Sequence, residues 1–381
     1  MRIPPRSLLL VPNHSTLIED GGARLESAEA DLLRSVRTRF QTAGIAAFVA
    51  RGANTSMSGI VGKSEARVHR LSALEHSGWW PRKLANYLVA AAILPFVLRR
   101  YDLLYIFCPG YCGSLAALWA RALGKPYGLY VRCTWLNRRA ATSFWWARIF
   151  AGASFMIVTG ESFRRRLSRY CANVVNEVPL TTLRPADVNP SGLEQRSSHR
   201  LLFAGRLAQS KGIYDVVRAL AILRRAGAPV HLTIAGGGVE EEIRALASLC
   251  DELGVRDAVT ILGHVPHAAL AEIYRNHSIF VFPSYFTEGF PRVLYEAMIF
   301  SLAIVTCAMP GTEGFLVDGV NCLHCRPSDP DQLAACLRRV LDDAQFGRSL
   351  GREARADVER LYETFTDASH AEQLLRLACS A

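Results

Sequence analysis

The 381-residue chain lacks an apolar run of the roughly 20 residues that a membrane-spanning helix needs. Its longest candidate, residues 84–98, comprises 15 residues and includes Pro95, so we do not expect it to cross a bilayer. The sequence also has no internal repeat and no low-complexity segment, and the apolar run at 7–10 is too short for a signal peptide. These absences argue against repeat, secreted and integral membrane proteins, and a composition that is 50% hydrophobic favours two ordinary globular domains.

Cysteine is present ten times, but without the spacing of a disulfide framework. Several cysteines, such as Cys108, Cys133 and Cys307, lie within apolar runs, which indicates small buried side chains in a reducing compartment. Cys322 and Cys325 have the CxxC spacing of a redox or metal site, but no second pair follows. We therefore expect no metal site.

Acidic residues are scarce in the first half of the chain. Residues 1–200 hold 12 Asp and Glu against 27 Lys and Arg, a net charge of +15, whereas residues 201–381 hold 22 against 17, a net charge of −5. This asymmetry predicts an anionic partner for the first half. No zinc-finger, RNP or helix-turn-helix signature supports nucleic acid, so anionic lipid headgroups or a phosphate-bearing acceptor fit better.

Strand-like and helix-like segments alternate along that half. Residues 7–12 and 101–109 are typical of buried strands, and residues 23–40 and 114–124, which follow them, are typical of helices. Alternation of this kind predicts a parallel sheet covered on both faces. The Pro, Ser and Gly content of residues 185–199 indicates a linker to the second half.

Two glutamates eight residues apart, Glu288 and Glu296, lie where an apolar strand (278–284) meets a helix (293–300). The loop that carries Glu288 precedes Pro291, which suits a first helical turn, and a helix N-terminus favours an anion. Eight helical residues rise about 12 Å, more than the roughly 5–9.5 Å between paired glycosidase carboxylates. Two contacts along one elongated ligand fit better. The alternative is a loop carboxylate and a solvated helix carboxylate.

A basic loop precedes another predicted helix, at 215–225. Gly205 permits a tight turn after a strand, and Arg206 and Lys211 follow it. An arginine fork and a lysine point charge at a helix entrance suit a diphosphate. Two solvated loop cations are the alternative interpretation.

Together with AGGG (235–238), LGHV (262–265) and DGVNCLHC (318–325), these segments resemble the retaining nucleotide-sugar glycosyltransferases of family 4. The resemblance is dense over residues 200–345 and loose before them. It implies the GT-B fold, an α/β architecture in which two Rossmann-like domains with doubly wound parallel sheets face a cleft. The N-terminal acceptor-binding domain would comprise residues 1–190, joined by a C-terminal helix at 366–381, and the nucleotide-sugar-binding domain would comprise residues 199–365.

The resemblance also implies roles for individual residues. Arg206 and Lys211 would neutralise the diphosphate, Glu288 would bind a sugar hydroxyl and stabilise positive charge on the ring, and Glu296 would hold the ribose hydroxyls. The first three form the implied catalytic set. Further donor contacts are implied for Gly22, Gly205, Val265, Gly289, Phe290, Arg292 and Val293. No organic cofactor and no metal are expected, because the cations already serve the phosphates.

The implied reaction moves a sugar from a nucleotide-diphosphate donor to a glycan or lipid-linked acceptor, in polysaccharide or cell-envelope glycoconjugate synthesis. We expect a cytoplasmic protein and no nucleic-acid partner. Two interpretations stay open for residues 84–98 and for the aromatic stretch at 144–146: contact with the inner face of the membrane, which the basic first half favours, or helices packed on the Rossmann-like sheet. Two alternatives stay open: a sugar-nucleotide epimerase of the same fold, and an inactive sugar-nucleotide-binding subunit. The intact set of Arg206, Lys211, Glu288 and Glu296 argues against an inactive subunit.

Overall fold

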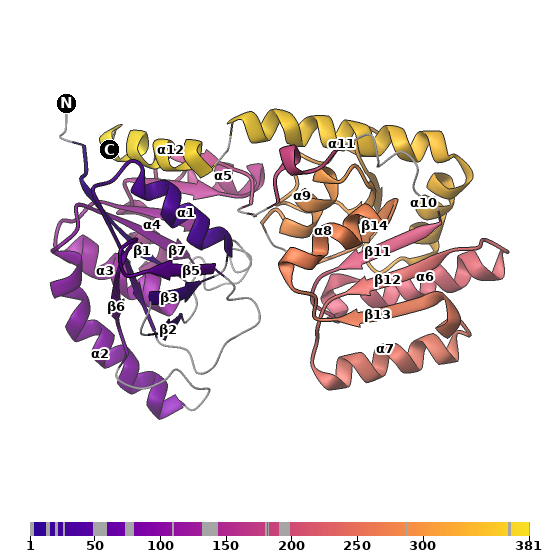
Figure 1. Ribbon diagram of the computed structural model, residues 1–381, viewed down its shortest axis with the longest axis horizontal. Coiled ribbons are helices and arrows are strands. Elements are labelled where there is room, and N and C mark those ends of the chain that lie inside the picture. Colours follow the sequence, from indigo (N-terminus) through magenta and orange to yellow (C-terminus); the bar gives the residue numbers. More distant parts are fainter. Residues whose placement is uncertain are drawn as a thin grey trace. The chain divides into compact units, whose positions relative to one another are not determined.

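The computed structural model describes residues 4–12, 16–19, 22–25, 27–48, 59–72, 80–108, 110–131, 144–179, 181, 183–189, 199–286, 289–364 and 367–380. The chain divides into two compact units, one of Met1–Thr182 with Thr364–Ala381 and one of Leu183–Glu363. Each unit contains one main parallel sheet flanked by helices (Figure 1). The predicted α/β fold with two Rossmann-like sheets is therefore confirmed.

The main sheet of the first unit has the strand order β10-β9-β8-β7-β1-β4-β6. Its strands are β1 (Ser7–Val11), β4 (Thr42–Ala47), β6 (Arg67–Arg70), β7 (Leu103–Cys108), β8 (Tyr127–Val131), β9 (Phe155–Val158) and β10 (Val174–Asn176). The central strands β1 and β7 are buried at every position, as their continuous apolar sequences predict for a sheet covered on both faces. The order of the strands reverses between these two, which makes their carboxyl ends the switch point of the sheet.

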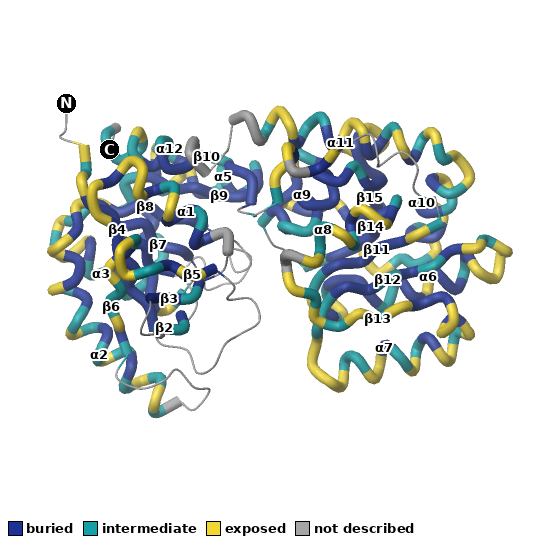
Figure 2. Tube along the Cα trace, viewed as in Figure 1, coloured by how far each residue is buried: buried dark blue, intermediate teal, exposed yellow. Residues whose placement is uncertain are grey.

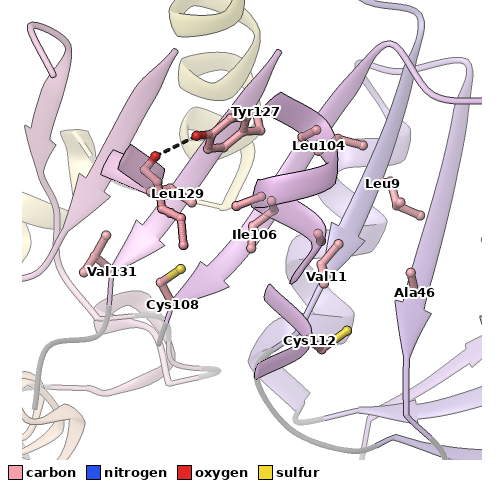
Figure 3. Close-up of a cluster of buried hydrophobic side chains, with 14 of the residues drawn as sticks. Leu9, Val11, Ala46, Leu104, Ile106, Cys108, Cys112, Tyr127, Leu129 and Val131 are labelled. Carbon is pink, nitrogen blue, oxygen red and sulfur yellow. Dashed lines mark hydrogen bonds between the residues drawn. The ribbon is translucent and has the colours of Figure 1, made fainter. Parts of the chain in front are cut away.

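Two hydrophobic cores lie on opposite faces of this sheet. One lies beneath α1 (Ser27–Arg37) and α12 (Asp367–Ser380). The other lies beneath a layer formed by α2 (Trp80–Leu98), α3 (Tyr111–Ala122), α4 (Phe144–Ala151) and α5 (Glu161–Leu167). Figure 3 shows the second core, where the Tyr127 hydroxyl donates a 2.6 Å hydrogen bond to the Ile149 carbonyl of α4. The burial pattern along the trace follows these layers (Figure 2).

The predicted helix at 23–40 is wrong at its beginning. A small antiparallel sheet of β2 (Leu17–Glu19), β3 (Gly22–Leu25) and β5 (Gly59–Gly62) precedes α1, which starts at Ser27. Gly22, for which the resemblance implies a donor contact, opens β3 with φ +150°, and a Cβ there would lie 2.0 Å from the Val61 carbonyl oxygen. Only glycine fits this approach, and the partner strand β5 lies too far along the chain for local periodicity to indicate it.

The C-terminal helix α12 belongs to the first unit and is fastened to it by buried polar contacts. His370 places Nδ1 2.6 Å from the Glu177 Oε2, and its Nε2 shares a 3.1 Å hydrogen bond with the Tyr105 hydroxyl of β7. The three side chains are fully buried. These contacts of His370 with Glu177 and Tyr105 hold α12 against the main sheet of the first unit.

The sheet of the second unit has the strand order β13-β12-β11-β14-β15-β16. Its strands are β11 (Arg200–Ala204), β12 (His231–Ala235), β13 (Val259–Gly263), β14 (Ile279–Phe282), β15 (Ala303–Cys307) and β16 (Leu323–Cys325). Its helices are α6 (Ile213–Arg225), α7 (Glu240–Glu252), α8 (His267–Arg275), α9 (Arg292–Ile299), α10 (Pro330–Asp342) and α11 (Ala344–Thr364), with 3₁₀ turns at Pro185–Asp187, Gln209–Lys211 and Arg256–Ala258. The order reverses between β11 and β14, and this reversal defines a second switch point.

A buried arginine joins the chain entering this unit to α9 and α11. The guanidinium of Arg355 donates hydrogen bonds to the carbonyls of Ile299, Pro185 and Val188, and its Nε lies 2.6 Å from Glu359. An arginine suits this position because its planar fork can serve several acceptors at once.

Candidate active site

The loops at the second switch point lie side by side. The loop after β11 contains Gly205 and Arg206 and ends in the 3₁₀ turn Gln209–Lys211, and the loop after β14 leads to α9. The Tyr285 amide donates a 3.1 Å hydrogen bond to the Ser210 carbonyl and so joins the two loops. Ligands of open α/β sheets bind at such a point, so the basic loop and the E-x7-E segment share one edge of the sheet.

Glycines allow the surrounding loops to pack backbone against backbone. The Gly205 amide donates to the Ala235 carbonyl at 2.9 Å, and a Cβ on Gly236 would lie 1.7 Å from the Gly205 carbonyl oxygen. Gly212, with φ +74°, precedes α6 where a Cβ would lie 2.4 Å from the Pro283 carbonyl oxygen. Gly236 and Gly212 were not predicted as site residues, although the glycine run after β12 was a visible signal.

The two predicted cations have different environments. Arg206 is exposed, whereas Lys211 is buried, with its Nζ 5.6 Å from the ring centre of Phe282 and 5.2 Å from that of Phe286. Cation–π contacts of this kind contribute about 0.5–2 kcal/mol and orient the ammonium group. Lys211 is thus not a solvated loop cation, and it immediately precedes Gly212 and the N-terminus of α6, an end that favours an anion.

Glu296 is also not a solvated helix carboxylate, because only 1% of it is exposed. The Tyr274 hydroxyl of α8 donates a 3.1 Å hydrogen bond to its Oε2 and lies 3.4 Å from the Val293 carbonyl. Burial raises the pKa of Tyr274 well above its usual range, and the adjacent Glu296 carboxyl adds to that shift. Tyr274 therefore stays a donor at every ordinary pH. No sequence pattern indicates the role of Tyr274, because its contact with Glu296 depends on how α8 packs on α9.

The remaining predicted residues are placed as follows. Glu288 lies outside the described residues, so its role stays a prediction. Phe290 is buried with its ring centre 5.0 Å from that of Phe315, so its side chain belongs to the core and only its backbone could serve a ligand. Partly buried positions at this edge are Gly289, Arg292 and Val293 around the start of α9, and Val265 beyond β13. Gly22 belongs to the first unit.

Neither a metal site nor a disulfide is found in the described part of the chain. No group of three His, Cys, Asp or Glu side chains gathers there as a ligand set. The nine described cysteines are free, and Cys133 lies outside the described residues. Cys325 faces Cys307 on the neighbouring strand, with 3.7 Å between the sulfur atoms, rather than acting with Cys322. Cys325 lies in strand β16 and Cys322 directly before it, so the CxxC spacing does not mark a redox or metal site here.

The second half of the chain is similar in sequence to known glycosyltransferases. Residues 190–357 match the family model for glycosyl transferases group 1. An uncharacterized glycosyltransferase of Methanocaldococcus jannaschii is 33% identical over 185 residues, which are 48% of this chain and 46% of that protein. The chain thus spans about half the length of the curated relatives it matches.

Two solved structures share the fold over nearly the whole chain. Sucrose-phosphate synthase of Thermosynechococcus elongatus superposes with a TM-score of 0.75 at 20% identity, covering 98% of this chain and 99% of that one. HepE of Anabaena, solved in complex with UDP-glucose, superposes with a TM-score of 0.74 at 16% identity, covering 98% of this chain and 100% of that one. The expected GT-B fold is confirmed by these neighbours.

Proposed function

We propose that the chain is a retaining glycosyltransferase that uses a nucleoside-diphosphate sugar, because residues 190–357 match the family model for glycosyl transferases group 1. One observation carries the proposal: at the switch point of the second sheet, the Arg206–Lys211 loop is joined to the loop that leads to Glu296. Cations for a diphosphate and a buried acceptor for hydroxyls therefore lie along one sheet edge. A nucleoside-diphosphate sugar presents both groups.

The chemistry follows from the charges. Breaking the glycosyl bond leaves an additional negative charge on the diphosphate, so Arg206 and Lys211 stabilise the transition state more than the bound donor. Glu296 accepts hydrogen bonds from the ribose hydroxyls, and Glu288 is assigned to the sugar. An acceptor hydroxyl attacks the anomeric carbon on the face from which the diphosphate departs, and its proton passes to the leaving phosphate oxygen. The anomeric configuration is thereby retained.

The proposed acceptor is a glycan or a lipid-linked saccharide. The net charge of +15 on residues 1–200 favours an acceptor that carries phosphate. A uridine diphosphate sugar is the first donor to test, since HepE of Anabaena, which shares the fold, was solved with UDP-glucose.

The test is the shift in thermal midpoint with UDP-, GDP-, ADP- and CMP-sugars, measured on the wild type, Arg206→Ala and Glu296→Ala. Arg244→Ala is the matched control, because Arg244 is an exposed arginine of α7 in the same unit. Loss of one charge-assisted contact costs about 1.5–3 kcal/mol, so the Kd for the donor should rise about 10- to 100-fold in the two site variants. No shift with any donor, or equal affinity in Arg206→Ala and Arg244→Ala, would contradict the proposal.

A second measurement separates transfer from the alternative activities. The donor is incubated with and without a mixed glycan and lipid-linked acceptor pool, and the sugar nucleotide is followed by NMR. Transfer requires the acceptor and releases the nucleoside diphosphate. Conversion of the donor into its epimer without acceptor would identify an epimerase instead, and binding without any turnover would identify an inactive subunit.

A further inference from the structure

Helix α2 exposes an apolar face. By length and composition, its segment Pro81–Leu98 is the one described helix that could cross a membrane, yet 28% of that segment is buried within the protein. The buried positions include Ala90, Leu94 and Leu98, which pack in the core against the main sheet of the first unit. One side of α2 therefore belongs to the globular core of the first unit, and its other side faces outward.

The outward positions of α2 are apolar along most of its length. Leu84, Leu88 and Phe96 are 49%, 65% and 66% exposed, and with the exposed Ala92 they recur at intervals of four residues. No charged residue occurs between residues 84 and 98. A surface helix of a globular domain normally presents polar residues on its outer side, so this face is suited to an apolar environment.

Exposed aromatic side chains also occur on the neighbouring helices α3 and α4. Helix α3 packs against both α2 and α4, so the three helices form one layer and their outer sides face away from the same sheet. Tyr111, which begins α3, is 77% exposed, and its ring centre lies 5.4 Å from that of Tyr87 on α2. Phe144 and Trp145, which begin α4, are 66% and 62% exposed. Tyrosine and tryptophan of this kind concentrate at the level of lipid headgroups.

The charged side chains of α2, α3 and α4 have one sign, whereas α5 of the same layer also carries Glu161. Helices α2, α3 and α4 contain four basic residues and no Asp or Glu, and Arg99 and Arg100 lie exposed directly beyond α2. The basic residues within the helices are Arg82, Lys83, Arg121 and Arg148. The opposite helix layer is mixed, because α1 and α12 carry acidic residues as well. A second copy of the chain would meet this face with like charges, which disfavours a symmetric dimer.

From these observations we propose that the outer face of α2, α3 and α4 docks on an anionic lipid bilayer. The apolar stripe of α2 and the aromatic residues lie in the interfacial region, and the cations contact the headgroup phosphates. This docking does not depend on the donor chemistry of the second unit, so its failure would leave the proposed activity untouched.

The experiment is flotation with vesicles of phosphatidylglycerol and phosphatidylcholine at low salt, compared with vesicles of phosphatidylcholine alone. The wild type should float with the anionic vesicles and dissociate at high salt. Leu88→Glu with Phe96→Glu should abolish flotation. The matched control is Val317→Glu with Val320→Glu, two apolar residues of the second unit that are 48% and 51% exposed, and it should float like the wild type.

A second variant tests the cations separately. Each basic residue near an anionic surface contributes about 1 kcal/mol, so Arg99→Ala with Arg100→Ala should weaken vesicle binding about 30-fold. Unchanged thermal midpoints would show that both double variants fold. Equal flotation with neutral vesicles, or flotation of the Leu88→Glu, Phe96→Glu variant, would overturn the proposal. The proposal would also be overturned if light scattering showed that the wild type is a dimer and that the Leu88→Glu, Phe96→Glu variant is a monomer, because the face would then bind a second copy of the chain.

Discussion

Tyr274→Phe isolates the contribution of one hydrogen bond to the candidate active site. The substitution removes a single oxygen atom and keeps the ring, which stacks on Phe300 with 5.2 Å between ring centres. Glu296 then loses the donor that lies 3.1 Å from its Oε2, in surroundings that exclude water. A hydrogen bond to a charged group contributes about 1.5–3 kcal/mol. We expect the free energy of unfolding of the second unit to fall by up to that amount.

The functional effect should be specific to the ribose of the donor. If Glu296 accepts both ribose hydroxyls, the wild type prefers a normal donor over its 2′-deoxy and 3′-deoxy analogues. A carboxyl that Tyr274 no longer orients should lose much of this preference, so the ratio of kcat/KM for normal and deoxy donors should fall about 10-fold. Because the pKa of Tyr274 is raised far above 10, the wild-type ratio should stay constant up to pH 10.

Tyr127→Phe is the matched control. Tyr127 is also buried and donates to a backbone carbonyl, that of Ile149 at 2.6 Å, but it belongs to the first unit. Its loss should lower stability and leave the ribose preference unchanged. If Tyr274→Phe also destabilises the protein without changing the ratio of normal to deoxy donors, the reasoning about Glu296 is refuted.

Three further predictions concern packing. Gly236→Ala should abolish the donor-induced thermal shift, because the added Cβ would overlap the Gly205 carbonyl. Gly237→Ala is the control and should bind the donor like the wild type, because its Cβ would lie 3.6 Å from the nearest atom. Equal donor binding by the two variants would contradict this prediction. Arg355→Met should lower the free energy of unfolding by about 1–3 kcal/mol in urea titrations, because three buried carbonyls would lose their hydrogen-bond donor. A loss below about 1 kcal/mol would contradict this role of Arg355. Burial raises the pKa of the Cys112 thiol to about 12, so iodoacetamide at pH 8 should alkylate this thiol only when urea unfolds the protein. If mass spectrometry detects rapid alkylation of Cys112 in the native protein, the thiol is not buried as described.

The sequence predicted the fold where local patterns are strong. Residues 278–284 and 293–300 correspond to β14 and α9, because a continuous apolar run and a helical repeat are both local signals. The position of Arg206 and Lys211 between a strand and a helix was visible for the same reason. The match to family motifs then indicated the GT-B fold, which the structural neighbours confirm.

Contacts between distant segments could not be predicted in this way. Gly22 opens a strand because β5 pairs with it, and that partner lies beyond the whole of α1 and β4. Tyr274 reaches Glu296 across 22 residues through the packing of two helices. The burial of Lys211 between two phenylalanines likewise depends on the tertiary approach of two loops, which a pattern of single residues does not encode.

The docking of α12 has a consequence for the order in which the protein matures on the ribosome. His370 completes a buried cluster with Tyr105 and Glu177, yet the whole second unit is translated between Glu177 and His370. A nascent chain that ends before α12 therefore presents a first unit with one helix missing from the core beneath α1. The second unit is complete at Glu363, before α12 begins at Asp367, so the half that is synthesised first is the half that is finished last.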